Sequence, residues 1–81
     1  MSNKIILNIG FGNSIAVEKI IAIVQSNSAP IKRYIKNKTE KNEVIDATMG
    51  KKLRSVIVMS DGIAVLSAIS VPALSSRLEN E

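Results

Sequence analysis

The chain has 81 residues, of which 46% are hydrophobic but only 2% aromatic, and it carries a net charge of +4 with no cysteine or histidine. This length indicates one domain, residues 1–81, with a modest core of aliphatic side chains. The missing residue types exclude disulfides and the usual structural zinc sites, so we expect self-association to supply extra stability.

The apolar runs are too short for a membrane segment or a secretion signal. Ile5–Leu7 is interrupted at Asn8, which is too early for a signal-peptide core, and Ile20–Val24 cannot span a bilayer. We therefore predict a cytoplasmic protein without a membrane partner, and the lack of cysteine fits a reducing compartment.

The first elements alternate apolar segments with turn residues. A strand is expected over Lys4–Ile9, followed by a turn at Gly10–Asn13, where glycine readily accepts positive φ. The segment Ser14–Val24 fits a capped helix or a strand, and its β-branched run at Ile20–Val24 favours a buried strand.

A helix is expected next, from an N-cap at Ser28 to about Lys41, with Pro30 in its first turn. At helical spacing its apolar side chains share one side and its cations project from the other. The apolar side comprises Ile31, Tyr34 and Ile35, and the cationic side Lys32, Arg33 and Lys36.

The second half predicts an antiparallel meander. Strands at Val44–Thr48 and Leu53–Met59 are expected to form a hairpin around the turn Met49–Lys51. The dipeptide Asp61–Gly62 is a strong turn signal that leads into a third strand at Ile63–Leu66.

The last residues predict a short helix capped by Ser70, with Pro72 near its start and Leu74 and Leu78 on its packing side. The expected fold class is therefore α+β, with a small antiparallel sheet, one central basic helix and a short C-terminal helix.

No motif indicates catalysis. The glycines at Gly10 and Gly12 lack the third glycine of a dinucleotide loop because Ile15 takes its place, and no Walker phosphate loop is present. Asp46 is the one acid within an apolar stretch, but a strand acid that faces solvent or pairs with a lysine is far commoner than a catalytic one. We predict a non-enzyme without cofactor, metal ion or small-molecule substrate.

The informative feature is the distribution of cations. One group lies on the predicted helix and a second, Lys51, Lys52 and Arg54, surrounds the predicted hairpin tip. Such side chains attract nucleic acid first and anionic membrane second, although a merely solubilising charge remains the alternative. With only Phe11 and Tyr34 to stack on bases, duplex binding fits better than single-strand binding.

Several segments, in this order, carry a family resemblance: Asn8–Asn13, Ala29–Arg33, Ile45–Thr48, Gly50–Arg54, Val56–Met59 and Leu66–Ala68. Together they resemble the RemA-like family of small bacterial regulators of extracellular-matrix and biofilm genes, over nearly the whole chain. The resemblance implies a transcription regulator that binds double-stranded DNA as a closed homo-oligomeric ring. Avidity across the ring would sum weak phosphate contacts, provided that the DNA bends.

The family places DNA-contacting arginines at the positions of Lys19, Lys51 and Lys52. Lysine keeps the charge but loses the planar fork, so phosphate attraction is retained while sequence preference weakens, and Glu18 reduces the field at Lys19. We expect Lys51 and Lys52 to contact DNA first, then Lys19 and Arg54. Lys32, Arg33 and Lys36 come last because they also suit subunit contacts. A non-catalytic scaffold and an RNA-binding protein remain the alternatives.

Overall fold

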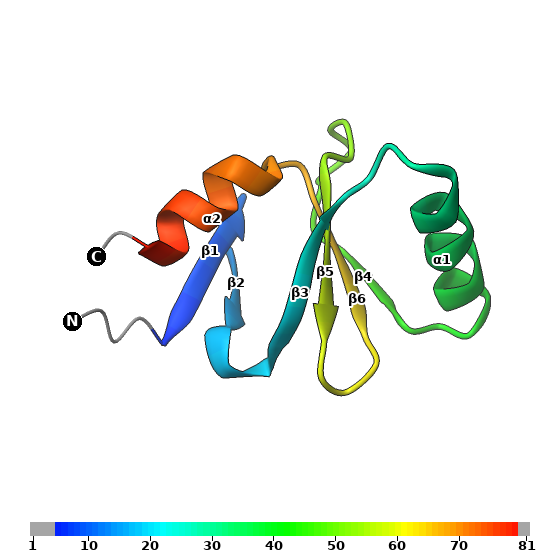
Figure 1. The fold of residues 1–81 in the computed structure, drawn as a ribbon, viewed down its shortest axis with the longest axis horizontal. Helices are drawn as coiled ribbons and strands as arrows, with labels where there is room; N and C mark the ends of the chain where they lie inside the picture. The colour runs from blue at the N-terminus through cyan, green and yellow to red at the C-terminus, as the bar shows by residue number, and fades with distance from the viewer. Residues whose placement is uncertain (1–4, 80–81) are drawn as a thin grey trace.

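The computed structural model describes residues 5–79 and has the predicted α+β fold class (Figure 1). Its strands are β1 (Ile6–Gly10), β2 (Asn13–Ala16), β3 (Ile20–Gln25), β4 (Val44–Asp46), β5 (Ser55–Met59) and β6 (Ala64–Ser67). Its helices are α1 (Ala29–Glu40) and α2 (Val71–Glu79), and the short 3-10 turn η1 (Val17–Lys19) precedes β3.

The elements form three layers. Strands β1 and β2 make a two-stranded sheet, whereas the other strands form one sheet in the order β3-β5-β6-β4. Figure 1 shows this larger sheet nearly edge-on, with β1, β2 and α2 on one side and α1 on the other. Both faces of the larger sheet are therefore covered, and its outer strands are β3 and β4.

The predicted hairpin between β4 and β5 is wrong. Strand β4 pairs with β6 in parallel, from Val44 opposite Ala64 to Asp46 opposite Leu66, while β5 lies between β3 and β6. The reason is burial: four of the five β5 residues are buried and take the sheet centre, whereas short β4, with exposed Ile45, takes an edge. The larger sheet is consequently mixed, and residues 47–54 form a crossing loop rather than a hairpin tip.

The predicted strand at Ser14–Val24 is correct in type but wrong in extent. The turn η1 divides it into β2, which pairs with β1, and β3, which pairs with β5. A bulge at Ile21 then leaves that side chain 65% exposed, while Ile20 and Ile23 pack against the core. The expected strand start at Lys4 lies outside the described residues.

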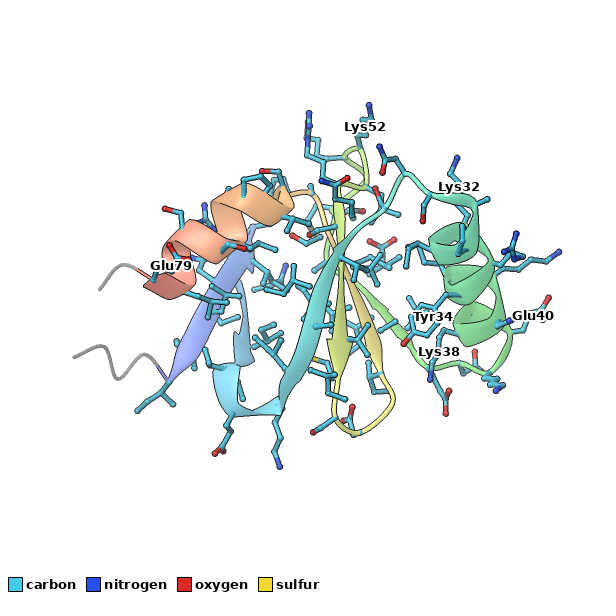
Figure 2. All side chains as sticks on the ribbon, viewed as in Figure 1. Lys32, Tyr34, Lys38, Glu40, Lys52 and Glu79 are labelled. Atoms are coloured by element: carbon cyan, nitrogen blue, oxygen red, sulfur yellow. The ribbon has the colours of Figure 1, made fainter. Side chains whose placement is uncertain are left out.

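Helix α1 confirms the predicted cap and boundaries. The Ser28 hydroxyl accepts a hydrogen bond from the Ile31 N–H at 3.3 Å, and Pro30 lies in the first turn. The apolar side chains Ile31, Tyr34 and Ile35 are half-buried, and in Figure 2 Tyr34 points toward the sheet.

One lysine fixes the far end of α1. Lys38 Nζ donates to the Gly62 carbonyl oxygen at 2.6 Å and pairs with the Glu43 carboxylate at 3.1 Å. The same ammonium lies 5.7 Å from the centroid of the Tyr34 ring, within reach of a cation–π attraction. No residue of α1 is fully buried, so these polar contacts act together with the half-buried apolar side of the helix to hold it in place.

The core lies between the larger sheet and the layer of β1 and α2, and it consists of Leu7, Ile9, Ala47, Ile57, Met59, Val65 and Leu74. Buried serine hydroxyls connect the layers: Ser67 donates to the Ile9 carbonyl oxygen at 2.9 Å and Ser55 to that of Ile69 at 2.7 Å. The Ser70 hydroxyl caps α2, as predicted, by accepting from the Ala73 N–H. Within residues 5–79, neither helix has the length and apolar character needed to cross a membrane.

Candidate nucleic-acid interface

The crossing loop at residues 47–54 presents the strongest group of cations. Its tip is a turn, as predicted, in which Met49 and Gly50 have φ angles of 54° and 78°. A Cβ at Gly50 would meet nothing within 4 Å, so the tip stands free of the body. Lys51, Lys52 and Arg54 are all exposed, and they reach solvent without desolvation of a charge.

Asp46 supports this loop from its base. Its Oδ1 accepts hydrogen bonds from the Thr48 N–H at 2.9 Å and the Thr48 hydroxyl at 2.7 Å. These bonds stabilise the carboxylate and lower the pKa of Asp46 below its ordinary value. The contribution of this contact to stability is therefore present at neutral pH and is lost only as the pH falls below that ordinary value. The role of Asp46 is to shape the loop, and it pairs with no lysine within the described residues.

The loop shares its end of the molecule with the start of both helices. Figure 2 shows Lys52 at this end, with Lys32 nearby at the start of α1, and Figure 1 shows α2 beginning beside the same loop. Neither helix has an acid in its first turn. The positive ends of the two helix dipoles therefore add to the field of the side chains.

Lys19 lies apart from this group. Its carbonyl oxygen accepts from the Ser60 N–H at 2.7 Å, at the end of the sheet where Ile20 pairs with Met59. The crossing loop adjoins the other end of the sheet. The length of β3 separates the two ends by roughly 17 Å, at about 3.4 Å per residue. A single chain does not bring Lys19 together with Lys51 and Lys52.

The remaining predicted cations lie on α1. Lys32, Arg33 and Lys36 are exposed on the side that faces away from the sheet, as helical spacing predicted. Lys32 and Arg33 lie near the start of α1, whereas Lys36 lies about one turn further along.

A hollow of about 190 Å³ opens beside the crossing loop. It is lined by Gln25, Ser26, Asn27, Lys52, Leu53, Arg54, Ser70, Val71 and Pro72. Sequence reasoning missed the amides of Gln25 and Asn27, because this segment signals only a polar break between strand and helix. Their placement depends on the pairing of β3 with β5, which brings the end of β3 to the loop.

Comparison with known proteins identifies relatives over almost the full chain. A model of the RemA-like family, described as extracellular matrix regulatory protein A-like, matches residues 6–78. Proteins from Bacillus cytotoxicus and Bacillus mycoides are each 51% identical over 75 residues, which cover 93% of this chain and 86% of each relative. The names of both relatives give them a provisional regulatory role.

Proposed function

The chain belongs to the RemA-like family, and on that premise we propose that it regulates transcription by binding double-stranded DNA as a closed homo-oligomeric ring. The genes concerned would be those of the extracellular matrix and biofilm. The observation that carries this proposal is the group of exposed cations on the crossing loop, at the end where both helices begin.

The geometry of the loop suits phosphate contact. Lys51 and Lys52 lie next to a free-standing tip, and within residues 5–79 none of the loop cations forms a salt bridge. Contact with a duplex would release counterions from its backbone, which favours binding and makes it salt-sensitive. Lysine ammonium groups attract any phosphate, so this part of the interface positions the DNA rather than reads it.

Repetition of the chain would turn these few contacts into firm binding. Each chain offers a small set of cations, whereas subunits related by rotation would present the same loop to successive stretches of one duplex. Self-association would use the edges of the outer strands β3 and β4, where each strand carries an exposed isoleucine: Ile21 on β3 is 65% exposed and Ile45 on β4 is 56% exposed. The separate position of Lys19 then suits contact with DNA at the other rim of each subunit.

The positions of the two aromatic rings favour a duplex over single-stranded nucleic acid. Tyr34 lies under Lys38, and Phe11 lies in the turn between β1 and β2, so the crossing loop carries no ring on which a base would stack. A non-enzymatic role agrees with the regulatory family. The same cations would also attract duplex RNA, and a scaffold would not need DNA at all.

A competition experiment tests the proposal. Labelled duplex DNA is bound to the protein and displaced by duplex DNA, duplex RNA or single strands of matched length at one salt concentration. We expect duplex DNA to be the most effective competitor, and binding to weaken steeply with added salt. Preferential displacement by RNA would favour the RNA-binding alternative, and the absence of any complex at low salt would favour the scaffold.

A further inference from the structure

We propose that the amide side chains of Asn27 and Gln25 contact base edges and determine the sequence preference of this protein. Lys51, Lys52 and Arg54 would hold the neighbouring phosphates while one strand of the duplex passes over the hollow. This inference rests on the proposed binding of duplex DNA, and it concerns residues that the family resemblance does not assign.

The pairing of β3 with β5 positions the first amide. Gln25 lies opposite Ser55, the residue that directly follows Arg54. Residues that face one another on paired strands have Cβ atoms about 5 Å apart, so Gln25 lies directly beside the end of the crossing loop. Gln25 and Arg54 both line the hollow.

Two hydrogen bonds position the second amide. The Ser26 hydroxyl donates to the Leu53 carbonyl oxygen at 3.1 Å, which ties the segment before α1 to the crossing loop. The Ser28 hydroxyl accepts from the Ile31 N–H and so fixes the other flank of Asn27 to the helix. The backbone at Asn27 is thereby held between two anchored neighbours, which lowers the main-chain entropy lost on binding.

Both amides are available to a ligand. Gln25 and Asn27 are exposed, and within the described residues neither side chain forms a hydrogen bond. The amides of Asn8 and Asn13, by contrast, are used in the turn between β1 and β2, where each bonds to the backbone of Gly10.

The chemistry of the hollow favours base contact by these amides. An Asn or Gln amide presents a donor and an acceptor side by side, which matches the N6 and N7 atoms of adenine in the major groove. Lysine offers no such pair, so the Lys51 and Lys52 positions contribute charge with little discrimination. The amides beside the cations are therefore well suited to discriminate between base pairs, and we expect a preference for adenine at the contacted positions.

The test measures sequence preference rather than affinity alone. A preferred duplex is first selected by the wild-type protein from a pool of random duplexes, and its affinity is compared with that of a scrambled duplex. For the double variant Asn27→Ala with Gln25→Ala, we expect roughly tenfold weaker binding to the preferred duplex. Binding to the scrambled duplex and the salt dependence should stay unchanged, because no charge is removed.

Asn37→Ala is the matched control, since Asn37 is exposed on α1 outside the hollow, and it should retain the wild-type ratio of affinities. A double variant that keeps this ratio, or that loses affinity equally for both duplexes, would overturn the inference, as would a selection that yields no preferred sequence. A wild-type protein that binds no duplex at all would instead refute the proposed function. Thermal unfolding of the variant, followed by circular dichroism, separates loss of contact from loss of fold.

Discussion

Replacing both Lys51 and Lys52 with alanine is expected to weaken duplex binding at least about tenfold, since tenfold corresponds to only about 1.4 kcal/mol. Both side chains are exposed on the crossing loop and lie outside the core, so their removal takes phosphate contacts away without disturbing the packing of the fold. Each lost contact should also reduce the slope of log affinity against log salt by roughly 0.9. Fluorescence anisotropy titrations with a labelled duplex over a series of salt concentrations measure both effects.

Single variants supply the matched comparison for this prediction. Lys52→Ala and Lys41→Ala each remove one positive charge from an exposed lysine. Lys41 follows the last residue of α1, whereas the crossing loop with Lys52 lies at the end where α1 begins. We expect the first to weaken binding and the second to change it little. Equal effects would mean that the whole charged surface, rather than the crossing loop, attracts the DNA.

The largest effect on stability is expected for Leu74→Ala. Leu74 belongs to α2 and is fully buried in the core, and truncation of such a side chain costs about 2–5 kcal/mol. Native domains are stable by only about 5–15 kcal/mol, and short chains lie near the lower limit. We therefore expect a large fall in the urea concentration at the unfolding midpoint, measured by circular dichroism.

Ile45→Ala serves as the control for Leu74→Ala because it removes a comparable aliphatic side chain that is 56% exposed. Its midpoint should stay close to that of the wild type at a protein concentration where assembly does not contribute. If Leu74→Ala unfolded at the same urea concentration as Ile45→Ala, the packing of α2 against the core would not be as described. Loss of this packing would also loosen the hollow, since Ser70 and Pro72 lie at the start of α2.

The parts of the fold that sequence predicts well are those with local causes. The hydroxyl of Ser28 needs only the N–H of Ile31 three residues later to start a helix, and Asp61–Gly62 needs only its own backbone preferences to form a turn. Ser70 starts α2 in the same way. Such signals act within a few residues and are visible in the order of the amino acids.

The pairing of β4 could not be predicted in this way. The short distance between β4 and β5 in the sequence favours a hairpin. In the structure β5 instead takes a central position in the sheet, because this strand is apolar on both of its faces. The position of the candidate site depends on that outcome. The pairing of β3 with β5 brings Gln25 and Asn27 to the basic loop and leaves Lys19 at the far end.

The family was identified by short segments rather than by composition. A net charge of +4 and a low content of aromatic residues fit many small proteins. The segments around Gly10–Asn13 and Gly50–Arg54, in this order along the chain, fit few. The resemblance they carry is confirmed by the family match over residues 6–78. Lysines stand at the positions where the resemblance implies arginines, so the neighbouring amides are the better candidates for sequence preference.

Native mass spectrometry, with and without a duplex, tests the proposed action most directly because it counts chains and detects bound DNA together. We expect the 8.7 kDa chain to be observed as one multi-chain species of fixed size, and the same number of chains to carry a duplex when DNA is added. Single chains in both samples, with no DNA complex even at low ionic strength, would contradict the account.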